Sequence, residues 1–373
     1  MTSHEGVNEM DMITIKDVAA AAGVSVSTAS RVIAGNPATS PEARVKVQAA
    51  VDRLDYRPNT QAQSLRSTRT NTIGLLVSDV RNPFFADLAH SAGQAALDAG
   101  YVTLLGNANE RTDQQDSYLN TLIQRRVDGI VMTPHGDGSG AVADIVRRRM
   151  PAVFVDRTIE GLDVPSVTTD STRGILQAVQ HLVGLGHERI GYISGPLSTS
   201  TGRERWRSFA AARTACGLPE DAQMVASGDY QAASGVAAME QLLSLPVPPT
   251  AVVAADSLMA VGAISCTRER QLHMGRDISL IAFDDIELFT LLNPSLTVIS
   301  NNVNEMGRLA IALLLDIIDG RDPESVVLPS ELIIRSSTSR PATAGTASLN
   351  QSTRNESTAS GHAQGRDQVI RAG

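Results

Sequence analysis

From Ile13 onward, apolar residues recur every three or four positions, which is the period of short amphipathic helices. Three helices are predicted, opened by capping hydroxyls at Thr14, Ser25 and Ser40, and the first two end at Gly23 and Gly35. Their expected inward residues are Ile15, Val18, Ala19, Ala22, Ala29, Val32, Ile33, Ala43, Val47, Ala50, Val51 and Leu54. The first two helices are separated by Gly23, Val24 and Ser25, the spacing of a helix-turn-helix. The pattern therefore predicts a three-helix head over residues 13–58.

Residues 59–70 are polar and contain almost nothing that a core needs, so we expect a hinge or linker there. The residues from Ala62 to Arg66 can form one helical turn if something stabilises it. Leu65 is the informative position, because a leucine in a polar, arginine-containing linker has no core of its own to join. Packing of Leu65 against the following domain is the plain alternative to a role in binding.

After Thr72 the pattern changes to short, continuous apolar runs that alternate with helices. Strands are expected at residues 73–77, 102–105, 129–132, 152–155, 190–193, 251–253 and 280–283. Helices are expected at residues 83–99 and 172–185, from Asp113, and near Val142 and Phe209. Continuously apolar strands are typical of parallel sheets covered on both faces. Roughly ten such strands fit two sheets better than one, so the fold class is α/β with a two-lobed core.

The core is expected at residues 71–339, with lobe one at about 71–168 and 302–329 and lobe two at about 169–299 and 330–339. Ligands in such folds bind at the carboxyl ends of the strands, here where the lobes face each other. Residues 1–12 lack the pattern of a secretion signal, and residues 340–373 are rich in small polar residues. Both ends are expected to be disordered, since neither can bury enough apolar area to offset its ordering entropy.

The composition excludes several classes of protein. No apolar run approaches the roughly 20 residues that span a bilayer, so we expect a cytoplasmic protein without a membrane partner. The two cysteines, Cys216 and Cys266, are expected to be inert buried thiols rather than a disulfide or zinc site. No metal or cofactor is expected.

The charge is unevenly distributed. The whole chain carries −8, but residues 13–70 carry +4 and the residues after Thr70 carry −9. A basic head on an acidic body favours a head that meets phosphate and a body that meets something else. A net charge of +4 makes DNA binding plausible but does not establish it.

Several motifs together resemble the LacI/GalR family of bacterial transcriptional regulators. They are the head from Ile15 to Ile33, Tyr56-Arg57-Pro58-Asn59, Ala62-Gln63-Ser64-Leu65, Asn82-Pro83-Phe84-Phe85, Arg126-Val127-Asp128-Gly129-Ile130, Leu185-Gly186-His187, residues 279–284 and residues 335–338. The likeness covers about residues 13–339. A helix-turn-helix alone is a weak signal, but this head, hinge and core in this order are very specific. The resemblance implies a periplasmic-binding-protein-like core and a repressor controlled by a small molecule.

With Ala29, Val32 and Ile33 facing inward, the second helix presents Val26, Ser27 and Arg31 outward. The resemblance places base-reading residues at these three outward positions, and Arg31 suits a two-atom contact with guanine. Hydroxyls of Thr14, Ser25 and Ser30 are expected to contact phosphates, which position the protein without specifying sequence. Without the surrounding helix-turn-helix and hinge motifs, Arg31 would be interpreted as a solvated surface arginine.

The resemblance also implies DNA contacts in the hinge at Asn59, Ala62 and Leu65. In that family, paired hinge helices form on DNA and their leucine wedges between base pairs in the minor groove. Two positions depart from the family pattern. Ala34 stands where many members have Asn, which removes a polar operator contact, and Ala29 stands where Val is usual, which trims the core of the head.

An effector site is expected where strands of the two lobes end, and the candidates at such strand ends are Phe84, Phe85, Asp156 and Arg157. The resemblance implies further effector contacts at Thr201, Arg205, Tyr230, Asp256 and Asp284. One of the two phenylalanines is expected to stack on the ligand and the other to pack inward. The carboxylates and arginines suit hydroxyl or oxyanion groups. Asp256 and Ser257 stand where the family frequently has Asn and Asp, which weakens the case for a simple sugar without excluding one.

The sequence therefore predicts a non-enzymatic regulator that binds double-stranded operator DNA as a homodimer and is switched by a small-molecule effector. A solute-binding protein or an α/β enzyme is the alternative. The first would need an export signal, and the second lacks a nucleophile elbow, dinucleotide fingerprint or metal-ligand spacing. The loop Gly136–Gly140 lacks the lysine and spacing of a phosphate-binding loop and is read as a turn, and His187 as structural. The effector, the operator, the direction of control and any oligomer above the dimer stay open.

Overall fold

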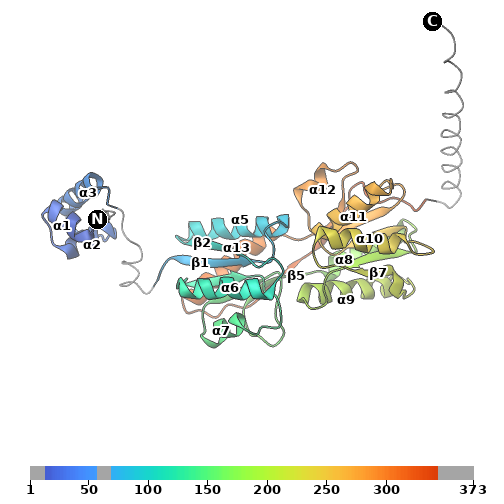
Figure 1. Cartoon of the computed structure of the whole chain (residues 1–373), viewed down its shortest axis with the longest axis horizontal. Helices are drawn as coiled ribbons and strands as arrows, with labels where there is room; N and C mark the ends of the chain where they lie inside the picture. Colours follow the sequence, from blue (N-terminus) through green and yellow to red (C-terminus); the bar gives the residue numbers. More distant parts are fainter. Residues whose placement is uncertain (1–12, 57–68, 343–373) are drawn as a thin grey trace, which may run out of the picture. The chain divides into compact units, whose positions relative to one another are not determined.

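The computed structural model describes residues 13–56 and 69–342, which form two compact units divided between Thr70 and Asn71 (Figure 1). The predicted disordered ends and most of the predicted hinge lie outside the described residues. We call the first unit the head and the second the core.

The head contains the three predicted helices, α1 (Ile15–Ala22), α2 (Val26–Ile33) and α3 (Pro41–Leu54). Local chemistry sets their ends: Ser25 Oγ accepts the backbone N–H of Thr28, Ser40 Oγ accepts that of Ala43, and Gly23 ends α1 at φ 65°. The buried residues are Val18, Ala19, Ala22, Ala29, Val47 and Ala50. The other predicted inward residues (Ile15, Val32, Ile33, Ala43, Val51 and Leu54) are half-buried. The head therefore has a small core of short side chains.

The first sheet of the core has the strand order β11-β5-β4-β3-β1-β2, and all its pairs are parallel. Its strands are β1 (Thr72–Val77), β2 (Val102–Asn107), β3 (Gly129–Met132), β4 (Ala152–Val155), β5 (Ser166–Asp170) and β11 (Val326–Pro329). Helices α5 (Pro83–Asp98) and α13 (Val303–Ile318) pack on one face. Helices α6 (Thr112–Gln124) and α7 (Ala141–Arg147) pack on the other. These elements form lobe one.

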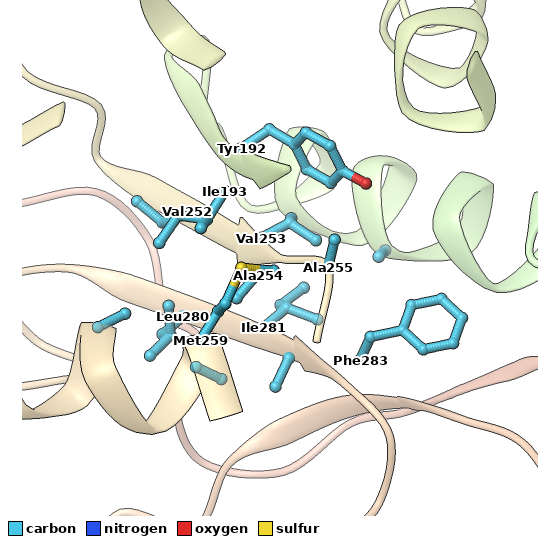
Figure 2. Close-up of a cluster of buried hydrophobic side chains, with 14 of the residues drawn as sticks. Tyr192, Ile193, Val252, Val253, Ala254, Ala255, Met259, Leu280, Ile281 and Phe283 are labelled. Carbon is cyan, nitrogen blue, oxygen red and sulfur yellow. The ribbon is translucent and has the colours of Figure 1, made fainter. Parts of the chain in front are cut away.

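The second sheet has the order β12-β10-β9-β8-β6-β7 and forms lobe two. Its strands are β6 (Ile190–Ser194), β7 (Val225–Ser227), β8 (Ala251–Ala254), β9 (Ser279–Phe283), β10 (Thr297–Ser300) and β12 (Glu331–Ile333). The covering elements are α8 (Thr172–Gly184), α9 (Ser200–Ala215), α10 (Ala232–Leu243) and α11 (Ser257–Glu269), joined by the short helices η1 (Ala222–Met224) and α12 (Glu287–Leu291). Figure 2 shows Val252 and Val253 of β8 beside Leu280 and Ile281 of β9, with Met259 of α11 against them.

The two-lobed α/β prediction is confirmed, with one exception to the parallel sheets. β12 runs antiparallel to β10, because the chain enters β12 directly from β11 across the lobe boundary without an intervening helix. The chain crosses between the lobes three times: after β5, between β10 and α13, and between β11 and β12. Both lobes are therefore built from segments far apart in sequence.

The described residues bear on the expectations about membrane spans, the two cysteines and His187. No helix among them is long and apolar enough to span a membrane. Both cysteines are free, but Cys266 is buried and Cys216 is half-buried, so the expectation of two buried thiols is wrong for Cys216. The predicted structural role of His187 is confirmed: the buried ring bonds Thr250 Oγ1, Ser279 Oγ and the carbonyl of Ser339, which ties residue 339 to lobe two.

Candidate functional site

Helix α2 presents a partly apolar, partly charged face to solvent. Ala29 is fully buried, while Val26 (37% exposed), Ser27 and Arg31 are exposed, as the helical period predicts. Within the described residues, the Arg31 guanidinium makes no hydrogen bond or ion pair. All five of its N–H groups are therefore available to a partner outside the head.

Other cations of the head hold its fold together. Arg44 donates from Nε to Thr39 Oγ1 (3.0 Å) and from Nη2 to two carbonyls of the turn between α2 and α3. Arg53 donates to the carbonyl of Ala21, and Lys46 pairs with Glu42. Lys16, like Arg31, has no such contact among the described residues. Fewer N–H donors of the head are therefore free to bond phosphate than its number of cations indicates.

Two of the three hydroxyls expected to contact phosphate, those of Thr14 and Ser25, already have partners. Both the N–H and the hydroxyl of Thr14 donate to Asp17 Oδ2 at 2.7 Å, and these bonds, with the backbone bond the larger cause, lower the pKa of the Asp17 carboxyl. Ser25 Oγ lies 2.9 Å from the hydroxyl of Ser27 and caps α2. Ser30 is half-buried. The hinge candidates Asn59, Ala62 and Leu65 lie outside the described residues.

In the core, a small cavity lies where the lobes meet. It is lined by Asn82 and by all nine residues that the sequence proposed for the effector: Phe84, Phe85, Asp156, Arg157, Thr201, Arg205, Tyr230, Asp256 and Asp284. Most of these residues follow the carboxyl ends of β4, β7, β8 and β9 or lie in the first turns of α5 and α9. The free volume is about 10 Å³, room for about one water molecule. The structure thus brings the predicted residues together in a closed arrangement.

The two arginines of the cavity are held by lobe one and lobe two respectively. Arg157 donates to both oxygens of Glu110 (2.6 and 2.8 Å) and to Ser78 Oγ. Its guanidinium lies 4.8 Å from the ring centroid of Tyr230, on the other lobe. Arg205 donates to the carbonyl of Ala255 (2.7 Å) and stacks 3.7 Å from the ring of Phe283. Asp156 Oδ1 lies 3.8 Å from Arg205 Nη2, which gives a second cationic contact between lobes.

Burial raises the pKa of all three aspartates that line the cavity. Asp284 rises to about 6 and Asp256 to about 7, the latter also because Asp284 lies nearby. The pKa of Asp156 rises for the same cause, although Arg205 and Arg157 oppose the shift. A ligand that donates hydrogen bonds or carries positive charge would lower these values.

Three site residues hold a backbone conformation that residues other than glycine seldom adopt. Asp156, Tyr230 and Asp284 have φ of 65°, 66° and 68°. Each follows a strand, so the sharp turn there redirects the chain at the cavity. Such strain costs on the order of 1–3 kcal/mol per residue and persists where the surrounding structure enforces it.

Sequence reasoning missed the residues that join the lobes. Asn82, on lobe one, donates from Nδ2 to Asp256 Oδ2 (3.0 Å) and accepts from Ser257 Oγ (2.9 Å). Arg81 donates to Gln231 Oε1 (2.9 Å), a second bond between the lobes. The signal for Asn82 was present, since it caps α5 immediately before Pro83. Its partners are more than 170 positions away and could not be inferred from spacing.

The two adjacent phenylalanines both lie at the boundary between the core of lobe one and the cavity. Phe84 and Phe85 both line the cavity, both are at least 95% buried, and their rings meet edge to face at 5.0 Å. The Phe85 ring also lies 6.0 Å from the Arg157 guanidinium. Both rings also belong to the apolar core of lobe one, so which of them stacks on a ligand stays a prediction.

Known proteins match both units. A family model described as bacterial regulatory proteins, lacI family, matches residues 14–59, and one described as a periplasmic binding protein-like domain matches residues 179–338. The chain is 33% identical to the catabolite control protein A of Priestia megaterium over 87% of this chain and 99% of that protein. It is also 33% identical to the transcriptional repressor CytR of Escherichia coli, over 87% and 96%. A solved structure of the Lac repressor dimer bound to operator and the anti-inducer ONPF superposes with a TM-score of 0.79 at 29% identity, over 88% of this chain and 99% of that one.

Proposed function

The chain belongs to the LacI family of bacterial regulatory proteins, and on that premise we propose that it is a repressor that binds a pseudo-palindromic operator as a homodimer. A small-molecule effector, a sugar or related metabolite, sets its affinity for that operator. Its relatives are transcriptional regulators, and we expect no catalytic turnover of the effector.

The observation that carries this proposal is the pairing of two features in one chain. The head exposes Val26, Ser27 and Arg31 on one face of α2, with Arg31 unpaired within the described residues. The core gathers the proposed effector residues at one interlobe cavity. A helix face of this kind fits the major groove, where Arg31 contacts guanine and Val26 a thymine methyl.

Exposed apolar side chains support the dimer. β2 is an edge strand, and it exposes Val102 (61%), Leu104 and Leu105, with Leu97 of α5 beside them in sequence. An apolar edge of this kind invites pairing and is normally covered in a native protein. In lobe two, Leu291 of α12 is 73% exposed. We propose that a second copy covers the β2 edge and the α12 surface.

Control by the effector follows from the bonds across the cavity. The lobes are joined by Asn82 with Asp256 and Ser257 and by Arg157 with Tyr230, all in or beside the site. A ligand entering there exchanges these bonds for its own and so changes the relative stability of open and closed lobes. Such coupling amounts to about 1–3 kcal/mol in typical allosteric proteins. Whether the effector induces or corepresses depends on which lobe conformation, open or closed, positions the paired heads and hinges for operator binding.

The experiment is selection of bound sequences from a random double-stranded DNA library with the full-length protein, with and without pooled metabolites. The expected result is a pseudo-palindrome whose half-sites lie about one helical turn apart. Recovery of half-sites without symmetry would overturn the dimeric reader. Failure to enrich any sequence under both conditions would overturn the assignment of the α2 face to base reading.

A further inference from the structure

A larger groove lies beside the interlobe cavity and has no part in the function proposed above. Its volume is about 740 Å³, in the range of small-molecule sites, and it is lined from both lobes. Lobe one contributes Thr112, His135, Asp137 and Glu160, and lobe two contributes Ser200 and Arg203. The loop Gly136–Gly140, predicted as a turn, contributes Gly136 and Asp137 to this wall.

A single layer of side chains separates the groove from the cavity. His135 and Thr158 line the groove, while Glu110, 3.5 Å from His135 Nδ1, holds Arg157 of the cavity. On lobe two, Thr199 lines the groove and bonds the hydroxyl of Tyr230, which lines the cavity (3.0 Å). Displacement of this layer would join the groove and the cavity.

This layer also contains buried polar atoms that make no hydrogen bond. His135 Nδ1 and Arg157 Nε have only longer ion-pair contacts among the described residues, with Glu110 Oε2 at 3.5 Å and Asp156 Oδ2 at 3.7 Å. Arg205 Nε of the cavity also makes no hydrogen bond there. Buried polar groups are nearly always bonded in native proteins, and leaving one unbonded is costly. A ligand that supplies oxygen atoms to this layer would remove that cost.

The charges define what such a ligand can be. Asp137 and Glu160 line the groove opposite Arg203, which uses Nη1 for two backbone carbonyls and leaves Nε and Nη2 unbonded within the described residues. The cavity and its wall hold four more carboxylates (Glu110, Asp156, Asp256 and Asp284) against two guanidinium groups. An anion would face excess negative charge. Hydroxyl groups donate to carboxylates and accept from arginines, so an uncharged polyhydroxyl molecule satisfies both.

We propose that the groove and the cavity are two compartments of one site that binds a neutral saccharide of at least two rings. One ring enters the cavity as the Arg157–Glu110 layer moves aside, and the next ring lies in the groove against Asp137, Glu160 and Arg203. This inference rests on the proposed function, because it names the effector of the same regulator.

The test is calorimetric titration of the full-length protein, with the fluorescence of Trp206, the single tryptophan, as a second readout from α9. The probes are glucose, galactose, cellobiose, maltose and lactose, together with the alditol and the aldonic acid of each disaccharide, which share an open-chain end and differ in charge. We expect at least one disaccharide to bind about tenfold or more tightly than its component monosaccharides, and its aldonic acid to bind more weakly than its alditol. Asp137→Asn and Glu160→Gln should each reduce the disaccharide-to-monosaccharide affinity ratio by roughly three- to tenfold, the loss of one charged hydrogen bond.

Glu220→Gln, an exposed site on lobe two away from the groove, is the matched control and should leave that ratio unchanged. Equal affinity for mono- and disaccharides, unchanged ratios in both groove variants, or no binding by any probe would overturn the inference. Operator selection is measured separately. A recovered palindrome with no saccharide binding would refute the two-compartment site and leave the repressor function standing.

Discussion

Asp256 gives the sharpest test of the electrostatics at the cavity, through Asp256→Asn. The side chain is buried, Oδ1 caps α11 by accepting from the N–H of Met259 (2.9 Å), and Oδ2 accepts from Asn82 (3.0 Å). Burial, helped by the charge of Asp284, raises its pKa from 3.8 to about 7. The amide has nearly the same shape but carries no charge and has a single oxygen for these two donors.

The expected magnitude follows from that shift. A pKa raised by about 3 units means that the ionised carboxylate destabilises the native state by about 4 kcal/mol at pH values above 7. The folded state binds the proton more tightly than the unfolded state, so wild-type stability decreases as pH rises from about 4 to about 7. The variant lacks this penalty but loses one hydrogen bond, worth roughly 1–2 kcal/mol. We therefore expect Asp256→Asn to stabilise by roughly 2–3 kcal/mol at pH 8.5 and to destabilise by roughly 1–2 kcal/mol near pH 4.

Urea unfolding followed by Trp206 fluorescence measures this directly, because Trp206 and Asp256 belong to the same lobe. The free energy of unfolding is compared between the proteins from pH 4 to pH 8.5, with Glu220→Gln as the exposed acidic control. The decisive feature is a change of sign in the stability difference with pH. A stability difference between the two proteins that keeps one sign and size from pH 4 to pH 8.5 would show that the ionised Asp256 carboxylate is stabilised by its surroundings. The proposed penalty for ionising Asp256 would then be refuted.

Three further predictions concern the head, the hinge and the dimer. Arg31→Ala should weaken specific operator binding by about 1–3 kcal/mol, measured by fluorescence anisotropy, because the free guanidinium contacts a base. Binding to random DNA should change little. An equal loss on both DNAs would show that Arg31 contacts phosphate. Leu65→Ala should weaken operator binding and leave effector affinity nearly unchanged, and unaltered operator affinity would exclude the minor-groove wedge. Leu105→Glu should shift sedimentation from dimer to monomer while circular dichroism shows that the monomer stays folded. A dimer that persists would place the interface away from the β2 edge.

Elements with strong local signals were predictable because their causes are local. The head helices follow from capping hydroxyls and a three-to-four-residue period, and the early core strands from continuous apolar runs. β5 was not expected, since Ser166-Val-Thr-Thr-Asp170 contains one aliphatic residue and becomes a strand by pairing between β4 and β11. β12 was not expected either, because it has only three residues. They form an antiparallel edge strand beside β10 only after the chain has crossed between the lobes.

Local sequence patterns predicted the exposed face of α2 and the strand ends at the interlobe cavity, and the family resemblance supplied the class of protein and the other effector candidates. Strand ends and helix period are short-range properties, and residues such as Asp156 and Asp284 directly follow readable strands. Which polar groups bond one another there depends on the packing of the two lobes. Asn82 with Asp256 and Arg157 with Glu110 join positions 174 and 47 residues apart. Such pairs depend on how two sheets close on each other, and no local pattern along the chain encodes that geometry.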